Sequence, residues 1–360
     1  DLHLQSGANI SADGHGLAAN AGAVHLWADG SARLESGALV SARGGELSGH
    51  GGSVELSAHD MVTLAGGELR ADATLGHAGS VLIDPTEIEV LSNVATEGSN
   101  YELLADKTIT VAQGVEISTR RAGQKAGNLT LKAAHIELKN GVQLLADGDS
   151  DALSGDITLA ASEVNVLGAD RAAHASVKIS GATLRGRNIT ISSDADTSLI
   201  ARALELAPHT SVADLQKMVD NEVAKPLDGP GAETYALSTQ ATASTEIFGS
   251  SIAGSGQVTI SSNAAARAGF KKTALAQTLI DNATITGQAV ALTSTANTSY
   301  VVEAFAQTLT LLDQSGLPSP DDSRVKVLDD SLFNFTSVPL LALSKSHANV
   351  TVSGATQIKA

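Results

Sequence analysis

The chain has no cysteine, hardly any aromatic residues and few basic ones. Without cysteine, its 360 residues can form neither a disulfide framework nor a thiolate-ligated metal site. A phosphate backbone is an unsuitable partner, because the formal net charge is −16 and nucleic-acid binding needs clustered lysine and arginine. No apolar run approaches the roughly 18 residues that a membrane span requires. The sequence therefore predicts no nucleic-acid partner and no membrane-spanning segment.

The residues that are abundant are small and apolar. Hydrophobic residues make up 42% of the chain, mostly alanine, valine, leucine and isoleucine, and they are accompanied by 34 glycines. This hydrophobic fraction is too high for a disordered chain, because so much apolar surface can offset the entropy lost on ordering. We therefore expect a folded chain with a narrow core.

A sequence unit recurs along the first half of the chain. The phrase GHGGSVEL at residues 49–56 returns almost unchanged as GHAGSVLI at residues 76–83. Aligning the alternating stretches gives equivalent anchor residues at steps of 30, 27, 20, 28, 28 and 32 positions. A regular step of this size is the signature of a repeat architecture. The anchors are Val24, Val54, Val81, Tyr101, Leu129, Ile157 and Ile189.

Each unit predicts three short strands. Apolar and polar residues alternate over runs of four to six, and glycine, asparagine or aspartate separates the runs. A unit of this length cannot bury its own apolar face, so it must stack on its neighbours. The sequence thus predicts an all-β chain, folded as a right-handed parallel β-helix with three short strands per coil. An antiparallel sandwich also has short alternating strands, but it gives no reason for an in-register repeat.

Two histidines occupy equivalent places in successive units. His50 and His77 each precede their anchor by four residues, and Asn20 holds that place before Val24. Asparagine and glycine tolerate the positive φ of tight turns, so this column predicts a stacked corner. The alternative is metal chelation by the two histidines, but the following units offer Lys125 and Leu153 at that position. We expect no metal site and no cofactor.

The two ends of the chain match the middle of a repeat. Residues 2–12 resemble residues 32–42, so the chain is expected to begin part-way round a coil. The pattern predicts a fragment of a longer filament. We divide it into regular coils over residues 1–200 and coils richer in serine, threonine and alanine over residues 201–360.

The second half contains two insertions. Its anchors are Ile189, Val258, Val290 and Val350, at steps of 69, 32 and 60, which leaves about 37 and 28 extra residues. The insertions are placed near residues 205–233 and 312–340. Both are expected to leave the helix after the same strand and to project from one face, two coils apart.

The insertions carry the candidate binding residues. The first shows one amphipathic helical face and predicts a short helix, and the second contains two acidic pairs and an aromatic group. Function concentrates on loops that a rigid scaffold carries, so the two insertions together are a candidate binding surface. The structural alternative is that their apolar residues pack against the wall of the β-helix and hold the insertions in place. The candidates are Leu215, Met218, Asp321, Asp322, Asp329, Asp330, Phe333 and Phe335.

The repeat resembles a known family. The G-x-V-x-L strands and the phrase GSVLIDPTEIEV at residues 79–90 are similar to those of filamentous haemagglutinin-like adhesins, exoproteins of bacterial two-partner secretion. Within this phrase, Pro85 ends a strand and precedes an irregular short coil of 20 residues. The resemblance implies a secreted fibre on the surface of a Gram-negative bacterium, exported through an outer-membrane transporter partner. It implies attachment to exopolysaccharide or to host or bacterial surface glycans and proteins, in biofilm or virulence.

The second functional class is a β-helical polysaccharide-active enzyme, such as a lyase, a hydrolase or an epimerase. The Gly-His-Gly phrases at residues 14–16 and 49–51 are compatible with it, but the paired carboxylates that glycoside hydrolysis needs are not evident. We therefore expect no catalytic residues.

An ice-binding solenoid would need threonine columns in successive coils, which the sequence lacks. Asp147, Asp149, Asp151 and Asp156 are similar to a calcium loop, but a solvated turn fits them better, because Ala152 replaces the required glycine.

Overall fold

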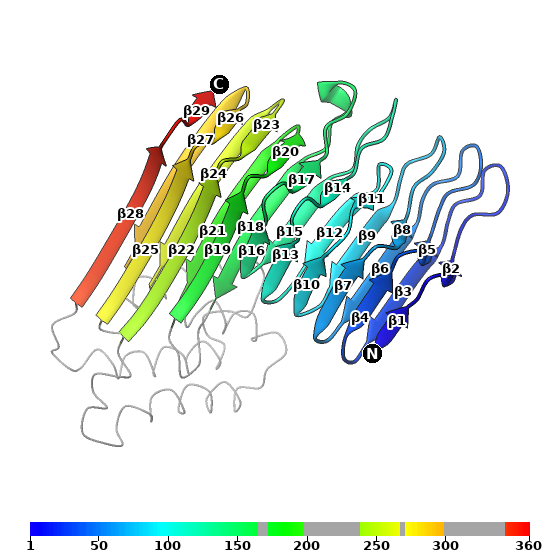
Figure 1. The fold of residues 1–360 in the computed structure, drawn as a ribbon, viewed down its shortest axis with the longest axis horizontal. Helices are drawn as coiled ribbons and strands as arrows, with labels where there is room; N and C mark the ends of the chain where they lie inside the picture. The colour runs from blue at the N-terminus through cyan, green and yellow to red at the C-terminus, as the bar shows by residue number, and fades with distance from the viewer. Residues whose placement is uncertain (165–171, 198–237, 267–270, 299–342) are drawn as a thin grey trace, which may run out of the picture.

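The computed structural model describes residues 1–164, 172–197, 238–266, 271–298 and 343–360, which form one parallel β-helix (Figure 1). Every ladder between two strands of the described residues is parallel, from the first pair, β1 with β4, to the last, β26 with β29. The predicted all-β solenoid is therefore confirmed, and the antiparallel sandwich is wrong. The candidate helix of the first insertion lies outside the described residues.

Three faces run along the helix, and successive strands of the chain belong to different faces. The first face is a nine-stranded sheet of β3 (Ala23–Ala28), β6 (Ser53–Ala58), β9 (Ser80–Asp84), β12 (Asn100–Leu104), β15 (Leu129–Ala133), β18 (Ile157–Val164), β21 (Ile189–Asp196), β24 (Gln257–Ala265) and β27 (Ala289–Asn297). The second face is a ten-stranded sheet of β1 (Leu2–Leu4), β4 (Ala32–Glu35), β7 (Met61–Ala65), β10 (Glu87–Val90), β13 (Thr108–Val111), β16 (His135–Leu138), β19 (Ala172–Ser180), β22 (Ser238–Phe248), β25 (Lys271–Asp281) and β28 (Leu343–Ser353).

The third face is divided into two sheets. A three-stranded sheet contains β2 (Asn9–Ser11), β5 (Leu39–Ser41) and β8 (Glu68–Arg70), and a seven-stranded sheet contains β11 (Val94–Ala95), β14 (Glu116–Ser118), β17 (Gln143–Leu145), β20 (Thr183–Gly186), β23 (Ser251–Gly254), β26 (Thr284–Thr286) and β29 (Gln357–Lys359). The ladder between β8 and β11 is missing, and this break falls in the short coil that the sequence predicts after Pro85. A 3₁₀ turn, η1 (Asp151–Leu153), lies in the connection between β17 and β18.

The predicted register is correct from Val24 to Val290. Val24 pairs with Val54, Val81 pairs with Tyr101 across the short coil, and Val258 pairs with Val290. The anchors therefore stack as one inward-facing ladder of the nine-stranded sheet. Side chains on such a ladder are buried by the coils above and below, which gives roughly 1.5–3 kcal/mol for each large aliphatic side chain.

The last predicted anchor, Val350, is wrong. It pairs with Thr278 on β25 and so belongs to the ten-stranded sheet. Alternation alone does not say to which face a strand belongs, and the V-T-V phrase fits both faces. Lys271 pairs with Leu343, a step of 72 residues, whereas Ser238 pairs with Lys271, a step of 33. The excess of the last coil is therefore 39 residues, more than the predicted 28.

In the later coils, the strands of the nine-stranded and ten-stranded sheets are longer than in the first coils, while the third face keeps its short strands. β18 has eight residues and β22 and β25 have 11 each, whereas β12 and β15 have five. Along β21, the buried residues shrink from Ile189 and Ile191 to Ser193 and Ala195, so the facing sheets can approach each other away from the third face. The high content of serine, threonine and alanine in these coils is thus a consequence of the narrow interior.

A chain of buried hydroxyl groups runs through this narrow interior. The Oγ of Ser193 lies 3.0 Å from the Oγ1 of Thr245 and 3.1 Å from the Oγ of Ser262. Ser262 in turn lies 2.9 Å from the Oγ1 of Thr278, which also accepts a hydrogen bond from Ser294 at 3.0 Å. Buried hydroxyls are stable only when they are hydrogen-bonded. The hydrogen bonds between successive coils give each of these hydroxyl groups a partner.

The two longest segments outside the described residues, 198–237 and 299–342, connect equivalent strands. Each follows a strand of the nine-stranded sheet, β21 or β27, and precedes a strand of the ten-stranded sheet, β22 or β28. The two attachment points are therefore at the same corner, two coils or roughly 10 Å apart. The described residues contain no helix that is long and apolar enough to cross a membrane.

Candidate ligand-binding cleft

Five loops stack at the corner where the third face meets the nine-stranded sheet, and we call them the corner loops. They project from one end of the strands (Figure 1). Each loop is closed by a backbone hydrogen bond from the glycine that follows it; for example, the N–H of Gly79 donates to the carbonyl oxygen of Ala71 at 2.7 Å. The corner loops are residues 13–21, 43–51, 72–78, 120–126 and 147–154.

One coil in the middle of this stack has no corner loop. There the N–H of Ser99 donates directly to the carbonyl oxygen of Thr96 at 3.1 Å, and only Glu97 and Gly98 lie between them. Both residues have left-handed backbones, with φ of 50° and 88°. Two successive positive φ values are typical of a type I′ turn, the tightest way to join two strands. The short coil of the sequence is thus short because this one loop is absent.

The missing loop leaves a cleft between its neighbours. Coils are spaced by about 4.8 Å, so omission of one level separates loops 72–78 and 120–126 by roughly 10 Å. The cleft has a volume of about 640 Å³, within the usual range for small-ligand sites. Its walls include side chains from both loops and from the strands at its base: Leu75, His77, Asn100, Arg121, Lys125 and Asn128.

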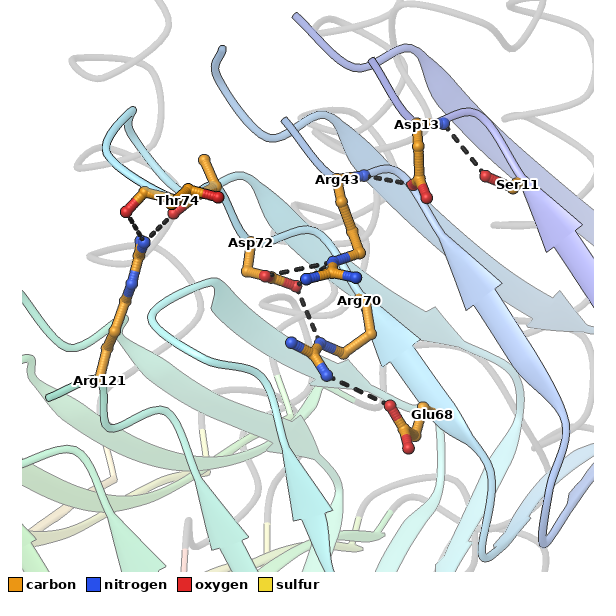
Figure 2. Close-up of polar contacts among 9 residues, drawn as sticks. Ser11, Asp13, Arg43, Glu68, Arg70, Asp72, Thr74 and Arg121 are labelled. Carbon is orange, nitrogen blue, oxygen red and sulfur yellow. Dashed lines mark hydrogen bonds and ion pairs between the residues drawn. The ribbon is translucent and has the colours of Figure 1, made fainter. Parts of the chain in front are cut away.

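Two side chains span the outer part of the cleft. The Nη2 of Arg121 donates to the carbonyl oxygens of Ala73 and Thr74, the latter at 2.6 Å (Figure 2). The Nε2 of Gln124 also donates to the carbonyl oxygen of Thr74, at 2.8 Å. Between other neighbouring loops, carbonyls receive backbone N–H groups from the adjacent loop, as when Leu47 donates to Leu17. The side chains of loop 120–126 therefore replace the donors of the missing loop.

The cleft is cationic although the protein is acidic. Arg121 and Lys125 line it, and no aspartate or glutamate is among its described lining residues. Within the described part of the chain, no carboxylate forms an ion pair with either cation. Of the acidic residues near the cleft, Asp149 accepts the backbone N–H of Gly123 at 2.7 Å, and Glu97 precedes the turn glycine at the base of the cleft. Two positive charges therefore face the cleft, and no side chain of the described residues neutralises them.

Amides and one apolar side chain complete the lining. The Oδ1 of Asn100 accepts the N–H of Asn128 at 2.9 Å, and the Oδ1 of Asn128 accepts the N–H of Asp156 at 3.0 Å. These bonds fix the two amides from coil to coil and use their oxygens, so their NH₂ groups remain as donors. Leu75 lies at the rim and is 68% exposed. The cleft thus offers cations, hydrogen-bond donors and a small apolar surface.

A charge network holds the loop that forms one wall. Asp72 is only 7% exposed; its carboxylate accepts the Nε of Arg70 at 2.8 Å and the Nε of Arg43 at 3.3 Å (Figure 2). Burial raises the pKa of Asp72, but the hydrogen bond and charge of Arg70, with Arg43, outweigh it, so the net pKa lies below its usual value. Glu68 accepts the Nη1 of Arg70 at 3.2 Å. The first residue of loop 72–78 is therefore anchored to its own coil by Arg70 and to the preceding coil by Arg43.

The histidine column forms a stacked corner, as predicted. The N–H of His50 donates to the Oδ1 of Asn20 at 2.9 Å, the N–H of His77 donates to the Nδ1 of His50 at 3.0 Å, and the two rings stack at 5.1 Å. The expected positive φ is wrong: within the described chain, the non-glycine residues with positive φ are Glu97 and Asn282. What the column shares is a side chain that accepts a backbone N–H of the next coil, as Asn20 and His50 do.

The acidic turn forms contacts between coils. Asp147 pairs with Arg120, with an Nη2–Oδ2 distance of 2.6 Å, and Asp156 pairs with Arg187 at 2.7 Å. The hydrogen bond of Arg187 is the main cause of a lowered pKa of Asp156. Asp151 begins η1. Within the described residues, no group of three or more histidine, aspartate and glutamate side chains is arranged to hold a metal ion.

The binding residues expected in the insertions all lie outside the described residues. They are Leu215, Met218, Asp321, Asp322, Asp329, Asp330, Phe333 and Phe335. The corner cleft, in contrast, was not expected from the sequence. The signal for it was present in the 20-residue step from Val81 to Tyr101, because a coil that short must omit a loop at one corner.

Comparisons with sequence profiles of protein families, with curated proteins and with solved structures give no match for this chain.

Proposed function

We propose that this chain is a segment of an extracellular bacterial adhesin of the filamentous haemagglutinin type. It acts without catalysis, by binding a surface ligand and by holding the binding site away from the cell as a rigid spacer. The ligands are an exopolysaccharide or a glycan or protein of a host or bacterial surface. In this proposal the chain reaches the surface of a Gram-negative bacterium through an outer-membrane transporter partner.

One observation carries the proposal: a ligand-sized cleft is built into the wall of a continuous β-helix. The nine-stranded sheet keeps its register from β3 to β27, so the cleft is fixed on stacked strands on both sides. Its cations, amides and Leu75 suit the binding of a saccharide, with polar groups for the hydroxyls and an apolar side chain for a ring face. Many such sites on a long fibre would give strong attachment from weak individual contacts.

The second candidate is a polysaccharide-active enzyme, and the composition of the cleft favours a lyase within that class. Hydrolysis needs a pair of carboxylates, and the described lining contributes none. In a lyase, the unprotonated imidazole of His77 would take the proton from C5 of a uronate whose carboxylate pairs with Arg121 or Lys125. The C4–O bond would break as the double bond between C4 and C5 forms, and the departing sugar oxygen would take a proton from water. Release of that unsaturated product from polygalacturonate would identify a lyase.

The test compares attachment of the full chain with attachment of a variant that lacks residues 205–233 and 312–340. Beads coated with either protein are measured for adhesion to Gram-negative biofilm and to cultured host cells. We expect both proteins to attach, because the cleft is retained, and to release no sugar product. Loss of attachment in the variant would move the site to the insertions. A chain that attaches to neither surface, or that cleaves polysaccharide, would overturn the proposal.

A further inference from the structure

We infer that the cleft between loops 72–78 and 120–126 binds the anionic group of an acidic saccharide, a carboxylate or a sulfate. This inference rests on the proposed binding function and names the ligand class of the same site.

The charges of the lining carry the first step. Arg121 and Lys125 come from one loop and face the same cleft, whose described lining contains no carboxylate. A chain with a net charge of −16 repels polyanions over most of its surface, so a local pair of cations is the place where such a ligand can approach. A neutral saccharide would gain nothing from these charges.

The hydrogen bonds of Arg121 carry the second step. Its Nη2 is used by the carbonyl oxygens of Ala73 and Thr74, and this contact fixes the guanidinium plane. The side chain also packs on the turn below it: a Cβ at Gly98 would lie 2.9 Å from its Cδ. No protein acceptor for the Nε and Nη1 of Arg121 is found in the described residues. A guanidinium that is held in this way, with N–H groups that no described residue accepts, is pre-organised for a planar carboxylate or a sulfate.

The neutral lining carries the third step. The NH₂ groups of Asn100 and Asn128 are donors at the base of the cleft, and Leu75 offers an apolar surface at its rim. A volume of about 640 Å³ is sufficient for one or two sugar rings. Among common anions, an acidic sugar uses all three features, whereas inorganic phosphate would leave the amides and Leu75 without contacts.

The experiment measures binding of the full chain to three polysaccharides by isothermal titration calorimetry. Polygalacturonate carries carboxylates, dextran sulfate carries sulfates and dextran is neutral, so the three arms distinguish the sources of the anion. We expect binding to at least one polyanion, no binding to dextran, and weaker binding as salt screens the cations.

The matched variants are Lys125→Gln and Lys139→Gln. Both remove one positive charge from an exposed lysine, but Lys139 follows β16 at a different corner. We expect Lys125→Gln to weaken polyanion binding about tenfold, the loss of one charge-assisted contact, and Lys139→Gln to leave it unchanged. Far-ultraviolet circular dichroism checks that both variants keep the β-helix.

Three results would overturn the inference. Equal weakening by the two variants would mean that the polyanion follows overall charge, and equal affinity for dextran would mean that the charges are irrelevant. If the full chain attaches to biofilm or host cells but binds neither polyanion, the ligand class is wrong while the proposed adhesive function stands.

Discussion

The Nη2 of Arg121 lies 2.6 Å from the carbonyl oxygen of Thr74, a residue 47 positions earlier in the chain and two coils away. The coil between them has no corner loop, so one long side chain closes a level of the stack that backbone hydrogen bonds close elsewhere. The β-helix therefore tolerates a missing loop without losing the order of the neighbouring loops, and the space that remains becomes the cleft.

Replacement of Arg121 should loosen loop 72–78. Arg121→Gln removes the guanidinium that donates to Ala73 and Thr74 and leaves only the Gln124 donor to Thr74. We expect a loss of about 1–2 kcal/mol in the free energy of unfolding, since the lost donor is charged. Hydrogen exchange of the amides in loop 72–78 should become faster, while the nine-stranded sheet keeps its protection. Arg33→Gln is the control, because its pair with Glu35 is exposed to solvent and its loss should leave exchange in loop 72–78 unchanged. Unchanged exchange in loop 72–78 would show that the hydrogen bonds of Arg121 do not stabilise this loop.

The position beneath the Arg121 side chain should require glycine, which is Gly98. Gly98→Ala places a side chain on a backbone with φ of 88° and 2.9 Å from the Cδ of Arg121, so both strain and a clash result. Gly114→Ala is a matched control, because Gly114 has φ of 74° but nothing within 4 Å of an added Cβ. We expect about 1 kcal/mol of destabilisation at Gly114 and about 2–3 kcal/mol at Gly98, measured by urea unfolding. Equal losses would mean that Arg121 moves freely aside.

The sequence predicts the repetitive parts of this structure, but it misplaces Val350 and does not reveal the cleft at the short coil. The inward ladder from Val24 to Val290 follows from alternation and a repeated step, because each coil needs the same residues to bury the next. Val350 is misplaced because alternation is identical on two faces. The cleft depends on contacts between loops 48 residues apart, such as Arg121 with Ala73, and no local pattern encodes such a contact.

The ion network around Asp72 should make stability depend on pH. The folded state lowers the pKa of Asp72, so its contribution is present above the unfolded pKa and is lost as pH falls through the lower, folded value. At neutral pH, Asp72→Asn leaves Arg70 and Arg43 without their buried partner and should destabilise by about 2–3 kcal/mol.

This difference between Asp72→Asn and the unchanged chain should shrink as the pH falls below the usual range of aspartate. Urea unfolding at several pH values measures it. Asp60→Asn, at an exposed pair with His59, is the control and should change stability by less than about 0.5 kcal/mol. A difference that is constant with pH would show that the ionised carboxylate of Asp72 contributes nothing.

The buried hydroxyl chain should behave as one unit. Ser262→Ala leaves Thr278 and Ser193 with fewer partners, and Thr278→Val does the same to Ser262, so each should destabilise by about 1–2 kcal/mol. The double variant removes both ends of one hydrogen bond and should lose about 0.5–1 kcal/mol less than the two single losses together. Ser261→Ala, one residue along β24 on the outer face, should change stability by less than about 0.5 kcal/mol. Strict additivity in this double-mutant cycle would mean that Ser262 and Thr278 are buried side by side without a stabilising bond.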